Sequence, residues 1–191
     1  MVRFRLSFLL AVTLFFGAGV SAHAGASRME QRASIMQKLF AELRASPDSA
    51  SAAQTRALIA NIWTRHDSPT ANLLMARVEA SMMAGRGDAA TALLDRIVEL
   101  YPDWPQAWRR RAEAAFSRGD LESAEIDLRR ALAAEPRDFL AMHQLAELLR
   151  QDKKGAEALE LLRRELTLDP QDADLRKEME RLTDQVEGQG I

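Results

Sequence analysis

The sequence contains no cysteine, three histidines and few aromatic residues, and each shortage excludes a class of protein. Without cysteine the chain has no disulfide framework, no thiolate metal site and no cysteine nucleophile. Three histidines are too few to favour a multi-histidine metal site. Aromatic residues make up 6% of the chain and glycine occurs 9 times, which is little for a β-sandwich or β-barrel. A formal net charge of −2 favours neither nucleic acid nor an anionic membrane as a partner.

Alanine and leucine supply most of the apolar residues of the chain. Hydrophobic residues make up 47% and charged residues 28%, which is the balance of a folded chain. Alanine and leucine favour helices because they lose little side-chain entropy when a helix forms. The composition therefore predicts an all-α protein.

The N-terminus has the three parts of a secretory signal. Arg3 and Arg5 are followed by an apolar stretch over residues 6–20 and by small residues around His23, which predicts cleavage after Ala24. Removal of residues 1–24 changes the formal charge from −2 to −4. We expect a periplasmic protein, since the chain lacks cysteine, and no stable membrane insertion after the signal has been cleaved. The alternative is a membrane anchor formed by residues 6–26.

The rest of the chain follows a period of 34 residues. Prolines stand at 102, 136 and 170, alanines at 90, 124 and 158, and glycines at 85 and 119. Proline ends helices and glycine permits tight turns, so each period predicts two helices. In the third copy the pattern predicts a turn displaced to residues 152–155. The expected helix pairs are 71–84 with 88–101, 106–117 with 121–135, and 138–151 with 156–168.

Two further features follow from this helical pattern. Asp103, Asp138 and Asp172 come just after the expected helix ends, where aspartate caps the next helix. Arg77 and Arg111 fall at positions that face the core of their units, and a buried arginine needs a carboxylate partner. We expect Asp127 to be the partner of Arg111.

The period and its positions resemble the tetratricopeptide repeat family. The second unit matches best, with Trp108, Ala112, Ala124, Ala131 and Pro136 in the family's places. Arginine replaces the family's leucine in the first two units. The resemblance implies an all-α, right-handed α-solenoid of stacked antiparallel helix pairs. Its three units would be residues 69–102, 103–136 and 137–170. A looser resemblance links three segments to small periplasmic repeat proteins of alphaproteobacteria.

The two ends of the predicted solenoid lie outside the period. Residues 25–68 are expected to form a helical hairpin, either a divergent repeat or an N-terminal cap. Residues 171–187 carry one apolar stripe on an otherwise charged helix, which predicts a C-terminal capping helix. Residues 188–191 are expected to be a disordered tail.

The resemblance implies a binding groove lined by the first helix of each pair. Methionine and Phe116 would make it partly apolar, and Arg150, Lys177 and Arg181 would make its C-terminal end basic. The implied groove residues are Asn72, Met75, Glu79, Met82, Gln106, Arg109, Glu113, Phe116, Leu140, His143, Glu147, Arg150, Lys177 and Arg181.

The sequence predicts no catalytic residues and no cofactor. It lacks the usual nucleophile and zinc motifs, and His143 with Glu147, one helical turn apart, has no evident third ligand. We therefore expect a non-catalytic, exported scaffold that holds a peptide or protein segment. Two alternatives stay open: a self-assembling structural protein that forms homo-oligomers, or a regulatory subunit of an envelope enzyme complex.

Overall fold

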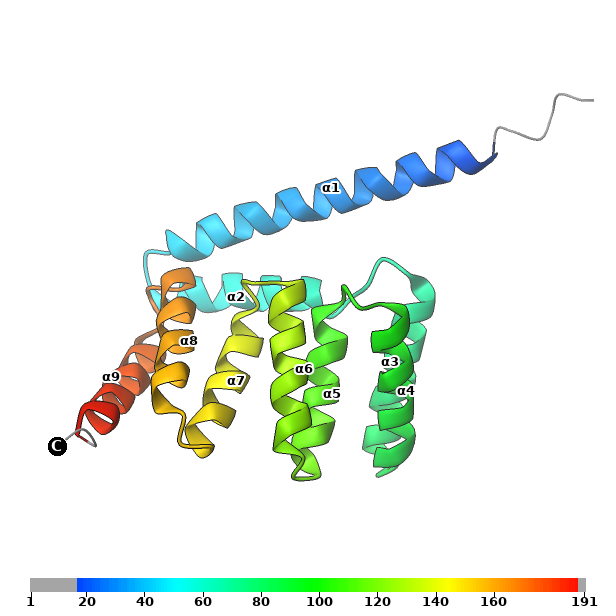
Figure 1. The fold of residues 1–191 in the computed structure, drawn as a ribbon. Coiled ribbons are helices and arrows are strands. Elements are labelled where there is room, and N and C mark those ends of the chain that lie inside the picture. Colours follow the sequence, from blue (N-terminus) through cyan, green and yellow to red (C-terminus); the bar gives the residue numbers. More distant parts are fainter. Residues whose placement is uncertain (1–16, 189–191) are drawn as a thin grey trace, which may run out of the picture. The chain divides into compact units, whose positions relative to one another are not determined.

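The computed structural model describes residues 17–188, which form nine helices and no strand (Figure 1). Residues 1–16 of the predicted signal and residues 189–191 of the predicted tail lie outside this range. In the described range no helix is both long and apolar enough to span a bilayer. The helices are α1 Gly17–Arg44, α2 Ser49–Trp63, α3 Pro69–Met83, α4 Gly87–Leu100, α5 Pro105–Ser117, α6 Leu121–Ala134, α7 Phe139–Gln151, α8 Gly155–Leu168 and α9 Ala173–Gly188.

The chain divides into two compact units, Met1–Lys38 and Leu39–Ile191. The described part of the first unit is helical and belongs to α1. The second unit contains the end of α1 and all the other helices. The features discussed below belong to this second unit.

Helices α3 to α9 form a series in which each helix packs against the next one along the chain. The pairs α3/α4, α5/α6 and α7/α8 begin and end within two residues of the predicted helices. Ala90, Ala124 and Ala158, one in the second helix of each pair, have no exposed surface at all. Alanine at these places lets the two helices of a pair approach closely, as the 34-residue period predicted.

Each of the three pairs turns through a residue with positive φ. Gly85 has φ +69°, Gly119 has φ +78°, and Lys153 has φ +59°. These positions are 34 residues apart, so the predicted displacement of the third turn is wrong: lysine occupies the position that glycine holds in the other two. Gly155 serves a different purpose, because a Cβ there would lie 2.8 Å from Cγ2 of Val186 on α9.

Two of the three predicted helix caps are confirmed. Asp138 accepts a hydrogen bond from the backbone N–H of Ala141 at 3.0 Å, and Asp172 accepts one from that of Leu175 at 3.0 Å. Asp103 does not cap α5. The cap position of α5 is held by Trp104, 34 residues before Asp138, so this aspartate comes one residue too early.

The predicted partner of Arg111 is also confirmed. Its guanidinium donates two hydrogen bonds to Asp127, at 2.8 and 2.6 Å, and lies 3.2 Å from Asp95 on α4. The prediction for Arg77 is wrong, since its side chain is exposed. Arg77 belongs to α3, the first helix of the series, so no preceding repeat covers its face.

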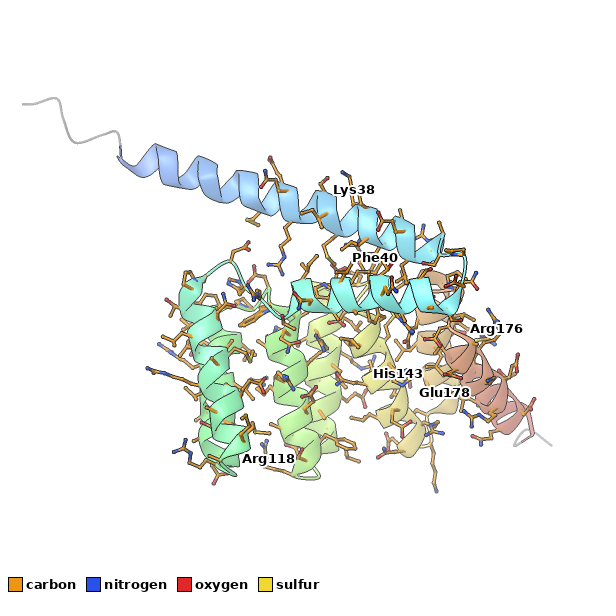
Figure 2. All side chains as sticks on the ribbon, turned by 180° about the vertical axis from the view of Figure 1, so that it is seen from behind. Lys38, Phe40, Arg118, His143, Arg176 and Glu178 are labelled. Atoms are coloured by element: carbon orange, nitrogen blue, oxygen red, sulfur yellow. The ribbon has the colours of Figure 1, made fainter. Side chains whose placement is uncertain are left out.

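Helix α2 does not continue the series. It runs across the first helices of the second and third pairs, α5 and α7 (Figures 1 and 2). Trp63, at its end, packs against Phe40 and Phe139 with ring centroids 6.0 and 5.0 Å away. The carbonyl of Trp63 accepts a buried hydrogen bond from Nε1 of Trp104 at 3.1 Å. These aromatic contacts fix the C-terminal end of α2 at the start of α5 and α7.

Candidate functional site

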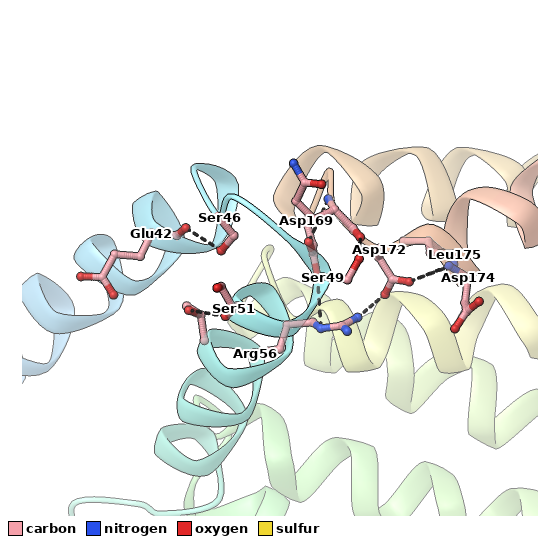
Figure 3. A network of polar contacts seen from close by, with 11 residues as sticks. Glu42, Ser46, Ser49, Ser51, Arg56, Asp169, Asp172, Asp174 and Leu175 are labelled. Carbon is pink, nitrogen blue, oxygen red and sulfur yellow. Dashed lines mark hydrogen bonds and ion pairs between the residues drawn. The ribbon is translucent and has the colours of Figure 1, made fainter.

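The beginning of α2 is fixed at the other end of the series by polar contacts (Figure 3). Ser49 donates a hydrogen bond to the carbonyl of Gln171 at 2.7 Å. Arg56 pairs with Asp169, 3.2 Å from Nε, and also with Asp172. Helix α2 is therefore held at both ends. It forms a wall beside α5 and α7, the first helices of the second and third pairs.

Between this wall and helices α5, α7 and α9 lies an open hollow of about 900 Å³, which we call the groove. Ligand sites in proteins are concave and combine apolar surface with a few placed polar groups. The groove has this composition. Its lining residues are Arg56, Ala57, Ala60, Thr64, Gln106, Arg109, Arg110, Glu113, Phe139, Leu140, His143, Gln144, Glu165, Asp172, Asp174, Leu175, Glu178 and Arg181.

Arg109 is a groove residue that also has a structural role. Its Nε lies 2.9 Å from Oδ2 of Asp138, and the two side chains are almost entirely buried. Burial raises the pKa of Asp138, and the Arg109 charge opposes this rise. Because Asp138 also caps α7, the pair joins the second repeat to the third.

The middle of the groove is lined by a network of polar side chains. Arg110 is held by Glu79 and Glu113, each at 2.9 Å, and Gln144 donates to Glu113 at 2.9 Å. Nε of Arg110 and Oε1 of Gln144 are buried and have no hydrogen-bond partner. The ion pair and the hydrogen bond to Glu113 fix the positions of Arg110 and Gln144 along the groove.

The end of the groove near α9 contains a histidine among carboxylates. Nδ1 of His143 lies 3.4 Å from Oε2 of the buried Glu165 on α8. His143 on α7 and Glu178 on α9, both labelled in Figure 2, line the groove. The contact with Glu165 raises the pKa of His143, and the charges of Glu178 and Glu147 add to the rise. Burial raises the pKa of Glu165.

A smaller hollow of about 390 Å³ lies near the start of the series, between α3 and α5. Asn72, Met75 and Glu79 contribute to its lining. Asn72 is engaged in structure, since its amide donates to the carbonyl of His66 at 2.7 Å and accepts from the His66 N–H at 2.9 Å. This hollow is therefore bordered by a residue that holds the connection between α2 and α3.

Comparison with known proteins finds matches to tetratricopeptide repeats in the part of the chain that forms the helix pairs. The tetratricopeptide repeat model matches residues 71–114 and 105–148. A TPR repeat-containing protein of Rhizobium etli is 26% identical over 186 residues, which cover 96% of this chain and 91% of that protein. Human FK506-binding protein-like is 31% identical over 86 residues, 44% of this chain and 25% of that protein.

Solved structures share the same arrangement of helices. The first TPR of Spaghetti (RPAP3), bound to an HSP90 peptide, has a TM-score of 0.56 at 22% identity, over 63% of this chain and 95% of that one. The fold is a tetratricopeptide-type solenoid. MamA has a TM-score of 0.55 at 15% identity, over 93% of this chain and 87% of that one. The TPR2B domain of yeast Sti1, in a complex with pHsp70, has a TM-score of 0.54 at 19% identity, over 64% and 99%.

The residues predicted to line the groove of this solenoid fall into three groups. The large groove is lined by Gln106, Arg109, Glu113, Leu140, His143 and Arg181. The smaller hollow contains Asn72, Met75, Glu79 and again Gln106. Neither of these two hollows is lined by Met82, Phe116, Glu147, Arg150 or Lys177.

Several lining residues were not predicted from the sequence. Those on α2 had no signal, because the position of α2 across the array depends on contacts with residues far along the chain. Glu165 belongs to a second helix, which the family pattern does not assign to the groove. Asp174 and Glu178 did have a signal, since they lie one turn apart on the capping helix and share a face with Arg181.

Two of the three cations expected at the C-terminal end, Arg150, Lys177 and Arg181, lie beside carboxylates. Arg150 pairs with Glu147 at 2.7 Å, and Lys177 lies 3.5 Å from Asp174. Only Arg181 of these three lines the groove. In the described part of the chain, no group of three or more histidine and carboxylate side chains is placed to hold a metal ion.

Proposed function

We propose that this protein is a non-catalytic scaffold that binds a peptide or protein segment in the groove between α2 and the first helices. The observation that carries the proposal is the groove itself, an open hollow of about 900 Å³ that combines apolar surface with charged and polar side chains. Tetratricopeptide neighbours that bind HSP90 and Hsp70 peptides support a role of this kind.

We further propose that the protein acts after export, in the bacterial periplasm. Support comes from the charged start, the apolar stretch over residues 6–20 and the small residues around His23. A C-terminal fusion to alkaline phosphatase, which is active only after export, should show activity that is lost when Arg3 and Arg5 are changed to Glu. An inactive wild-type fusion would contradict export.

The groove proposal is tested by filling the groove without removing a contact. Ala57 is exposed on α2 and lines the groove, whereas its neighbour Leu58 is exposed and does not line it. A photocrosslinker at position 140 should form an adduct with the partner in cells, and Ala57→Trp should abolish it. Leu58→Trp is the matched control and should keep the adduct. Equal adducts in the two variants would contradict the proposal.

Self-association is a second candidate function, favoured by the open face of α3. Leu73 is 56% exposed, but the residues 34 and 68 positions later, Ala107 and Ala141, have no exposed surface. In the second and third repeats the preceding repeat covers these places, so α3 presents an unused stacking face. Analytical ultracentrifugation should then show a dimer that Leu73→Glu dissociates, whereas a wild-type monomer at all concentrations would exclude this function.

A further inference from the structure

The α9 end of the groove holds more negative than positive groups. Four carboxylates line it, from Glu165, Asp172, Asp174 and Glu178, against the guanidinium groups of Arg56 and Arg181 and the imidazole of His143. The floor beside them is apolar and includes Phe139, Leu140 and Leu175. A segment bound here meets an apolar surface that ends in an acidic patch.

The cations at this end are already engaged or lie at its edge. The guanidinium of Arg56 is shared between two carboxylates, because it pairs with Asp172 and also with Asp169, which is 3% exposed. Arg181 is exposed, and its Nε donates to the carbonyl of Lys177 at 3.3 Å. Glu178 forms no ion pair with any residue that the structure describes.

Glu165 is the group that most needs a further partner. The residue is 8% exposed and lines the groove, and its buried Oε2 accepts no hydrogen bond. Nδ1 of His143 lies 3.4 Å away, without hydrogen-bond geometry. Burial raises the pKa of Glu165, the contact with His143 lowers it, and the charges of Asp172 and Glu178 raise it. A positive charge placed among these groups would relieve their mutual repulsion.

We propose that the α9 end of the groove seats a lysine or arginine side chain of the bound segment, between Glu178, Asp174 and Glu165. This inference rests on the proposed function and specifies the partner as a basic, partly apolar peptide. The stem of a lysine or arginine packs on apolar surface while its charged group reaches carboxylates. An acidic peptide would add like charge to an acidic cluster and is disfavoured there.

Random twelve-residue peptides displayed on phage, selected against the full-length protein, test the partner class. Clones that also bind Ala57→Trp are removed, so that the remaining peptides depend on the groove. We expect these peptides to be enriched in lysine or arginine beside apolar residues. Groove-dependent peptides without such enrichment would overturn this inference and leave the proposed function intact. A selection without any groove-dependent peptide would contradict both.

A charge reversal on α9 tests the proposed binding position of the lysine or arginine side chain. Fluorescence anisotropy would compare a selected basic peptide with its Lys→Glu counterpart. Glu178→Lys should lower the affinity for the basic peptide by about tenfold or more and raise the affinity for its Lys→Glu counterpart. The reason is that the reversal removes a charge that attracts the basic peptide and adds one that repels it. Glu180→Lys makes the same change on an exposed residue of α9 outside the groove. Its affinity for each peptide should stay within about twofold of that of the wild type. Equal effects of the two variants, with equal helical circular dichroism, would overturn the proposal.

Discussion

Three consecutive arginines, Arg109, Arg110 and Arg111, have three different environments. Successive residues of a helix point about 100° apart, so the first reaches Asp138 in the next repeat, the second borders the groove, and the third turns to Asp127. A run that looks like one basic patch in the sequence therefore forms one buried ion pair, one half-buried ion pair and part of the groove lining. Changes within it should have different consequences for stability and for binding.

At Arg111 the expected consequence is a loss of stability. Asp127 is 2% exposed and receives both of its hydrogen bonds from the Arg111 guanidinium. Arg111→Ala would leave this carboxylate buried without a partner, at a cost of about 2–4 kcal/mol in the free energy of unfolding. Urea denaturation measures the change. Arg96→Ala, which removes an exposed pair with Glu99, is the control and should cost less than about 1 kcal/mol.

At His143 we expect a pH-dependent contribution to stability. Its pKa is raised in the folded protein by Glu165 on α8, with Glu178 on α9 and Glu147 on its own helix. The folded state therefore binds the His143 proton more tightly than the unfolded state, whose histidine pKa is about 6.5. The resulting stability is present below that value and is lost as the pH rises through the folded pKa.

The measurement compares the free energy of unfolding at pH 6 and pH 8 in wild type and in His143→Gln. The wild type should lose more stability over this interval than the variant. The other histidines are common to both proteins, so their contributions cancel in the comparison. The same pH dependence in both proteins would contradict a charged His143 in the folded state.

At the scale of the element, the turns show how the period acts on the backbone. The left-handed conformation recurs at 85, 119 and 153, although the residue type changes from glycine to lysine at the third position. A left-handed conformation costs a residue with a Cβ about 1–2 kcal/mol. The repeat therefore preserves the shape of the turn more strictly than its residue.

Lys153→Gly should stabilise the protein by about 1 kcal/mol, because glycine adopts a positive φ without steric cost. Gly119→Ala makes the opposite change at the equivalent position. This change should destabilise the protein by a similar amount. No atom lies within 4 Å of the added Cβ, so the cost comes from the strained backbone alone. Thermal unfolding measures both. Changes of the same sign in the two variants would contradict this account.

The sequence predicted the elements α3 to α9 well and their relation to α2 poorly. Helix boundaries follow from local signals such as Pro136 and Gly119, and the pairing of Arg111 with Asp127 follows from one repeat unit. The place of α2 depends instead on Trp104 and Gln171, which lie 41 and 122 residues from their partners. Its sequence places Ile59 and Trp63 one turn apart, which indicates a buried face but not the distant residues that this face contacts. The acidic end of the groove depends on the same long-range folding.

At the scale of the whole compact unit Leu39–Ile191, α2 connects helices that other repeat arrays leave independent of one another. Solenoids usually contact only neighbouring repeats, so their ends open separately. Here one helix contacts the α8–α9 connection through Ser49 and Arg56, and it contacts the start of α5 through Trp63. Opening of the last helices therefore requires the contacts of α2 to break as well.

Arg56→Ala should therefore make α9 open more often. Hydrogen–deuterium exchange of residues 173–188 should become faster, because Asp169 and Asp172 lose their shared partner. Arg163→Ala is the control, since it removes an exposed pair with Glu160 on α8 and should leave this exchange unchanged. Equal exchange in both variants would show that α2 does not restrain the end of the array.

The path of α2 also has a consequence for the order of events during synthesis. Ser49 is made long before Gln171, the residue whose carbonyl it binds. The repeats can assemble one after another as they are synthesised, because each needs only its neighbours. The beginning of helix α2 can reach Gln171 only after that residue has been synthesised, although the contacts of Trp63 with Trp104 and Phe139 can form earlier. A nascent chain that stops before residue 171 would thus lack the hydrogen bond that fixes the beginning of this groove wall.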